Sequence, residues 1–166
     1  AGISQASGAM VGQNLGAKQF DRVKKGVRFG VICSISMAEC IGVIIFVAAP
    51  LLVRMFNDSP AVIEYGVLQS RTEALFYFLL AFAHCVAGIC RGAGRPIVPM
   101  AIMLGFWCVV RVVYIDIVLK FIPQIQMIFW AYPLTWGLSC IVFLIYLLKA
   151  DWMYHFEKRD RRANQA

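Results

Sequence analysis

The chain has 166 residues, of which 61% are hydrophobic and 15% charged, and its mean hydropathy is +0.73. Soluble domains carry about 45–50% apolar and about 25% charged residues, so this composition excludes an ordinary soluble domain. The formal net charge is +7. In a soluble protein that charge would suggest nucleic acid, but these charges flank apolar segments, where membrane topology and anionic lipid headgroups explain them better.

Residues 1–26 are expected to be the end of a preceding helix followed by a cytoplasmic connector. The chain begins with Ala1 rather than Met, and the letters AGISQASGAMVG are typical of the last turns of a helix. We therefore expect a fragment of a larger membrane protein.

Four long apolar segments fill most of the chain, at residues 27–53, 61–90, 97–119 and 126–148. The hydrocarbon core of a bilayer is about 30 Å thick, and roughly 20 apolar helical residues cross it, so each segment is long enough. The expected fold class is all-α: a polytopic helical membrane protein. Pro133 lies inside the fourth segment, where membrane helices tolerate kinks.

The basic residues fall on alternate sides of the implied membrane. Twelve lie on one side, against Arg54 and Lys120 on the other. The positive-inside rule places the twelve in the cytoplasm, so both ends of the chain are expected there. We expect a multi-pass protein of the plasma (inner) membrane with lipid as a partner. The twelve are Lys18, Arg22, Lys24, Lys25, Arg28, Arg91, Arg95, Lys149, Lys158, Arg159, Arg161 and Arg162.

The tail, residues 150–166, is basic and expected to be cytoplasmic. Trp152 and Tyr154 lie among charged side chains there, which predicts a short helix at the membrane interface. We expect no nucleic-acid partner, because no stacking platform or groove-reading fold accompanies the tail.

No part of the chain has the spacing of a metal site or an enzyme motif. The six cysteines all lie inside the apolar segments and form no CxxC pair, so they are expected to be packing residues. No nucleophile–base pair, HExxH or paired aspartate motif is present, so an enzyme is not expected.

Charged side chains within the apolar segments are costly, and they are the first candidates for function. Glu39 lies roughly 18 Å from the cytoplasmic end of the first segment, and Arg111 lies roughly 21 Å from the same side in the third. They match in depth, and either a structural ion pair or a role in substrate or ion movement fits. Pairing would keep the carboxylate ionised, whereas an unpaired one suits proton coupling. Asp116 is a second possible partner for Arg111.

The second segment supplies the remaining candidates. Arg71 and Glu73 lie in its outer third, where gating or stabilisation of the outer side is expected. Its aromatic side chains have two possible environments, an apolar cavity or the surrounding lipid. The cavity-lining candidates are Phe76, Tyr77, Phe78 and Phe82.

Short motifs follow one another in order along the chain. The first, Gly12-Gln13-Asn14-Leu15-Gly16-Ala17, precedes the basic Lys18. The second contains Arg91, Gly92, Gly94 and Pro96, followed by Pro99 and Met100. The third is Arg111 together with Tyr132-Pro133-Leu134-Thr135-Trp136.

In this order the motifs resemble those of the MATE family, the multidrug and toxic-compound extrusion transporters. That family has a G-Q-x-x-G-A junction, an R-G-x-G junction and a Y-P-x-S/T-W pattern. Arg95 is a departure, because many members have an acidic residue after the second glycine. The resemblance covers nearly the whole chain.

The resemblance implies a substrate/cation antiporter with two six-helix lobes that alternates between outward- and inward-open states. This chain would supply the end of the eighth helix through the twelfth, which is part of one six-helix lobe. The missing N-terminal lobe would be its partner, and amphipathic or cationic compounds its substrates. Na⁺ or H⁺ would be the coupling ion, with no other cofactor.

Two other functions stay open. A lipid-linked oligosaccharide flippase has a related architecture. Its cavity would be expected to hold more cationic groups, whereas this chain has only Arg71 and Arg111 at membrane depth. A non-transporting membrane scaffold or subunit is also compatible with the sequence.

Overall fold

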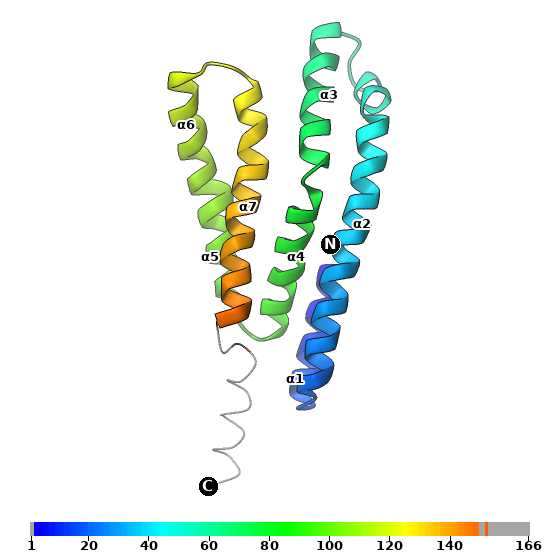
Figure 1. Cartoon of the computed structure of the whole chain (residues 1–166), viewed down its shortest axis with the longest axis vertical. Coiled ribbons are helices and arrows are strands. Elements are labelled where there is room, and N and C mark those ends of the chain that lie inside the picture. Colours follow the sequence, from blue (N-terminus) through cyan, green and yellow to red (C-terminus); the bar gives the residue numbers. More distant parts are fainter. Residues whose placement is uncertain (1, 150–151, 153–166) are drawn as a thin grey trace.

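The computed structural model describes residues 2–149 and residue 152, and every regular element in that part of the chain is helical (Figure 1). The all-α fold class is therefore confirmed. In chain order the elements are α1 (Gly2–Gly16), α2 (Phe20–Arg54), α3 (Pro60–Ala74), α4 (Tyr77–Gly92), α5 (Ile97–Leu104), the π-helical η1 (Gly105–Val110), α6 (Arg111–Phe121) and α7 (Gln126–Lys149).

The first long helix, α2, begins at Phe20 rather than at the expected residue 27. Hydropathy detects only the apolar part of a helix. The polar turns that precede this part are helical too, but they give no hydropathy signal. Asp21 lies in the first turn of α2, where the helix dipole stabilises a negative charge. The connector after α1 is consequently shorter than expected and consists of residues 17–19.

The expected second helix is broken into α3 and α4, whose axes differ by 54°. The third segment runs without a gap from Ile97 to Phe121 but contains the π-helical stretch η1. Three helices of the described chain are long and apolar enough to cross a membrane, and α3 with α4 makes a fourth if the bent pair is one span.

Helix α4 is the centre of the bundle, and in Figure 1 it lies between α2 and α7. Residues 85–90 are all buried, together with Ala83. One face of α4 shares a core with α1 and α2 around Val11, Val23 and Ile89. Another face packs with α7 around Phe143.

Helices α1 and α4 run in the same direction and touch through glycines. A Cβ atom on Gly8 would lie 2.7 Å from the carbonyl oxygen of Gly88, and one on Gly12 would lie 3.2 Å from that of Gly92. A Cβ on Gly92 would overlap the Gly8 carbonyl. Small residues spaced by four allow membrane helices to approach this closely.

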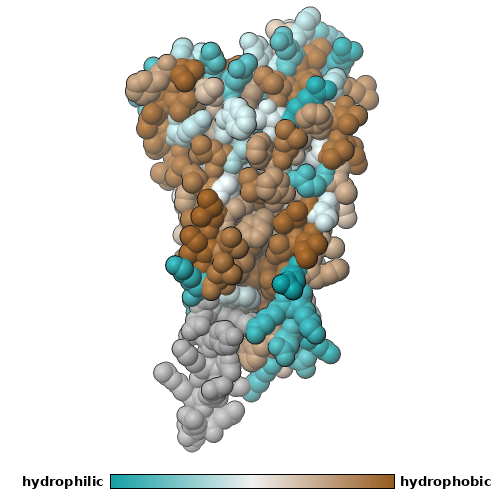
Figure 2. Space-filling model, in the orientation of Figure 1, coloured by the Kyte–Doolittle hydropathy of each residue, from teal (hydrophilic) through white to brown (hydrophobic). Residues whose placement is uncertain are grey.

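The face of the molecule seen in Figure 2 is largely apolar between two polar ends. Large apolar side chains are exposed along most helices, including Phe29, Val47 and Leu148 at 70%, 72% and 77%. Soluble monomers rarely expose contiguous apolar area on this scale. Trp152 of the predicted tail packs into the core shared by α1, α2 and α4. The other residues of the predicted tail lie outside the described part.

Candidate functional site

Three irregular helices meet at a group of polar and aromatic side chains, which we call the central cluster: Tyr77, Arg111, Tyr132, Thr135 and Trp136. Tyr77 is the first residue of α4, directly after the break. Arg111 is the first residue after η1. The other three surround Pro133 within α7. Irregular helices commonly mark functional positions in membrane proteins.

The aromatic rings of the central cluster are in contact with one another. The ring centroids of Tyr77 and Trp136 are 6.4 Å apart, and those of Tyr132 and Trp136 are 6.0 Å apart with an edge-to-face geometry. These spacings lie in the favourable range for aromatic pairs. The cluster therefore joins the start of α4 to the kinked part of α7.

Arg111 is half-buried in the central cluster. Its Nη2 and Nε atoms donate to Thr135 Oγ1 at 2.8 and 3.3 Å, and its guanidinium lies 4.3 Å from the centroid of the Tyr132 ring. No carboxylate of the described residues lies within ion-pair distance of it. A guanidinium carries five N–H groups, so the ring and one hydroxyl leave part of its donor capacity unused.

Glu39 and Arg111 do not pair, so of the two possibilities that the sequence left open the structural ion pair is absent. Glu39 is half-buried on α2 and accepts a hydrogen bond from the backbone N–H of Phe78, with 3.0 Å between Phe78 N and Glu39 Oε1. Helix α2 packs on α1, α3 and α4, whereas η1 and α6 pack on α7, so the two residues belong to different parts of the bundle. Equal depth did not make the helices neighbours.

Asp116 is also outside the expected charged network. Its carboxylate pairs with Lys120 Nζ at 2.8 Å, and both side chains are more than 60% exposed. Five residues separate Arg111 from Asp116, which rotates the two side chains by about 140° around an α-helix. Arg111 therefore faces α7, while Asp116 faces outward.

Arg71 and Glu73 lie inside the bundle on α3. The Nε atom of Arg71 donates to the carbonyl oxygen of Phe46 at 3.3 Å, and the guanidinium lies 5.2 Å from the Phe46 ring centroid. Glu73 accepts a hydrogen bond from Gln69 Nε2 at 3.0 Å. Arg71 thus ties α3 to α2, while Glu73 remains near enough to Arg111 for a favourable electrostatic interaction.

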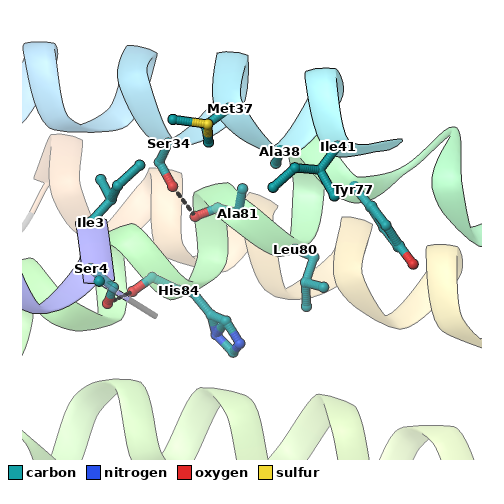
Figure 3. Close-up of a pocket in the computed structure, with 11 residues that line it drawn as sticks. Ile3, Ser4, Ser34, Met37, Ala38, Ile41, Tyr77, Leu80, Ala81 and His84 are labelled. Carbon is teal, nitrogen blue, oxygen red and sulfur yellow. Dashed lines mark hydrogen bonds between the residues drawn. The ribbon is translucent and has the colours of Figure 1, made fainter. Parts of the chain in front are cut away.

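A cavity of about 430 Å³ lies between α1, α2 and α4 (Figure 3). Tyr77, Ala81 and His84 line it from one face of α4, and Ser34 faces them from α2 and donates to the Ala81 carbonyl at 3.2 Å. Of the four aromatic cavity candidates, Tyr77 lines this cavity. It also belongs to the central cluster.

Phe76, Phe78 and Phe82 do not line the cavity, because they project from other faces of the same segment. Phe76 packs edge-to-face on Trp130 at 5.9 Å, and Phe78 is 37% exposed. Phe82 packs against the core between α4 and α7. A helix turns its side chains by about 100° per residue, so consecutive aromatics do not share one wall.

The glycine-rich junctions are helix ends with the same hydrogen-bond pattern. At the end of α4 the N–H of Arg95 donates to the Cys90 carbonyl and that of Gly94 to Arg91, while Gly94 has φ of 72°. This pattern is a Schellman cap, which requires a left-handed residue. Pro96 then precedes α5.

The first junction repeats the Schellman cap, with Lys18 as the left-handed residue at φ 59°. Gly12 lies within α1, and Gly16 is the last residue of that helix. Gln13 is exposed, and Asn14 Nδ2 donates back to the Met10 carbonyl at 2.8 Å. The motif therefore builds a compact end for α1 and a close contact with α4.

Sequence reasoning did not single out several polar contacts of the site. Trp107 Nε1 donates to Ser139 Oγ at 3.1 Å, and its ring lies 5.3 Å from that of His84. Ser4 donates to the His84 carbonyl at 2.6 Å. The Y-P-x-S/T-W pattern did indicate part of the site, because its residues Tyr132 and Thr135 are the two partners of Arg111.

The comparisons with known proteins agree with this architecture. The family model MatE matches residues 1–116, which cover the helices from α1 to the middle of α6. The probable multidrug resistance protein NorM of Thermotoga maritima is 34% identical over 107 residues, or 64% of this chain. The chain spans 23% of the length of that relative. The members of this family are multi-pass membrane transporters rather than enzymes, and because the match covers most of the chain, the chain belongs to the MatE family of multidrug efflux transporters.

Proposed function

We propose that the complete protein is a secondary antiporter, which exports amphipathic or cationic compounds in exchange for Na⁺ or H⁺. It acts in the plasma (inner) membrane, with both ends of this chain in the cytoplasm. The described helices form part of one lobe, and transport requires the remaining lobe as a partner. Lipid surrounds the apolar face of the helices.

The observation that carries this proposal is the composition and place of the central cluster. The ring faces of Tyr77, Tyr132 and Trp136 suit flat amphipathic molecules, and aromatic faces attract cations. The half-buried carboxylate of Glu73 lies on the neighbouring helix α3. Transporter sites are typically built where helices are interrupted, because such helices change conformation at a fixed site.

Arg111 rests on the Tyr132 ring in the position that a cationic substrate would take. We infer that a bound cation competes with Arg111 for this face. Among the described residues, Glu73 and Glu39 are the half-buried carboxylates and are available for ion coupling, whereas Asp116 is paired at the surface.

The test is transport by the full-length protein in liposomes with a fluorescent cationic dye. We expect dye movement when a Na⁺ or pH gradient is imposed, and the effective gradient identifies the coupling ion. Trp136→Ala should lower the rate, while the surface variant Asp116→Asn should retain it. Movement of a labelled lipid-linked oligosaccharide instead of dye would indicate a flippase. No gradient-driven movement of either would indicate a scaffold.

A further inference from the structure

The break between α3 and α4 contains no proline or glycine. Residues 73–80 read EALFYFLL. Sharp kinks in helices arise at proline, at glycine or serine pairs, at π-bulges, or where a side chain or a water enters the hydrogen-bond ladder. The 54° bend therefore points to a side chain that enters from another element.

Glu39 is that side chain. In a continuous helix the N–H of Phe78 would donate to the carbonyl of Ala74, four residues earlier. It donates instead to Glu39 Oε1 at 3.0 Å. The carboxylate of α2 has thus replaced the helix's own acceptor at the point where α4 begins.

Helix α2 contacts the chain on both sides of the break. Gly42 lies on the same face of α2 as Glu39, and a Cβ atom there would lie 2.8 Å from the Ala74 carbonyl oxygen. The backbone of α2 therefore lies against the end of α3, while the Glu39 carboxylate reaches the start of α4. Around them, the N–H of Phe76 donates to Glu73 and that of Leu79 to Phe76, both at 3.0 Å, in tight turns.

The charge of Glu39 decides how well it competes with the Ala74 carbonyl. A hydrogen bond to an ionised acceptor is roughly twice as strong as a neutral one, and the N-terminus of α4 favours a negative charge. The titratable side chains nearest the break in sequence are Arg71 and Glu73 on α3 and Tyr77 and His84 on α4, and α1 carries no titratable side chain. Among the described residues no cation forms an ion pair with Glu39.

We propose that the negative charge of Glu39 holds this span bent, and that neutralising Glu39 returns the Phe78 N–H to Ala74 and straightens the span. Glu39 is then a positioning residue. Tyr77 lies inside the break and contacts Trp136, so straightening moves one wall of the central cluster relative to α7. The functional consequence rests on the proposed antiport, in which loss of the Glu39 charge would be linked to substrate movement.

The bend itself is measured by cryo-electron microscopy of the full-length protein in nanodiscs. We expect Glu39→Gln to reduce the 54° angle. Glu64→Gln, a neutralised carboxylate at the exposed start of α3, is the matched control and should retain the bend.

A second substitution, added to Glu39→Gln, distinguishes straightening of the span from a general folding defect. Phe78→Pro removes the N–H that must return to Ala74 and keeps the helix kinked. We therefore expect the double variant Glu39→Gln/Phe78→Pro to remain bent. An unchanged angle in Glu39→Gln would overturn the inference and leave the transport proposal standing. A bend that decreases in Glu39→Gln, in a protein that moves no dye, would overturn the transport proposal alone.

Discussion

Arg71 supplies the hydrogen-bond donor that the carbonyl of Phe46 lacks. Pro50 lies four residues after Phe46 inside α2 and has no N–H to donate, and the Arg71 Nε atom lies 3.3 Å from the orphaned oxygen. In a bilayer a backbone carbonyl without a hydrogen bond is costly. Arg71 of α3 therefore satisfies the carbonyl in α2 that Pro50 leaves without a donor.

This relationship predicts coupled effects of Arg71 and Pro50 on stability. Arg71→Leu should lower the unfolding free energy of the full-length protein in detergent by about 1–3 kcal/mol, because a buried acceptor loses its partner. In a Pro50→Ala background the new N–H can serve Phe46, so the same substitution should cost less. Equal costs in both backgrounds, measured by denaturant titration, would show that Arg71 acts elsewhere.

Gly92 is predicted to be intolerant of any side chain. A Cβ atom there would overlap the Gly8 carbonyl, where neither backbone can yield without separating α1 from α4. We expect Gly92→Ala to cost about 1–3 kcal/mol, as overpacking typically does. Gly16→Ala is the control, because nothing lies within 4 Å of its Cβ position. Thermal unfolding of the two variants should therefore differ clearly.

The two Schellman caps predict opposite signs for substitutions at equivalent positions. Gly94→Ala should destabilise the protein, because a left-handed conformation costs an L-residue about 1–2 kcal/mol. Lys18→Gly should relieve a similar cost at the end of α1. Melting temperatures of both variants test this, and a gain for Gly94→Ala would contradict the assignment of the cap.

Some elements of the fold could be predicted from the sequence and others could not, for physical reasons. Long apolar runs indicate helices directly, and the order of the motifs indicated the family. The break at Phe76 could not be predicted, because its cause, Glu39, lies on another helix. The sequence also could not decide whether Glu39 pairs with Arg111, since depth along a helix does not specify which helices are neighbours.

Thr135 is the residue on which the geometry of Arg111 depends most directly. Its hydroxyl accepts both hydrogen bonds from the guanidinium and lies 2.8 Å from the Ala131 carbonyl, to which it donates. Thr135→Val keeps the shape of the side chain and removes the acceptor. We expect a loss of stability of about 1.5–3 kcal/mol, the usual value of a hydrogen bond to a charged group.

Thr135→Val should also reduce dye export per molecule, because Arg111 is no longer positioned to return to the Tyr132 ring and displace the bound cation. Thr135→Ser retains the hydroxyl and should preserve most of the export, which separates the hydrogen bond from the volume of the side chain. Export rates are compared in liposomes at equal protein content. If the valine and serine variants export equally well, the hydroxyl does not position Arg111 for transport, and the half-buried guanidinium is held by the Tyr132 ring alone.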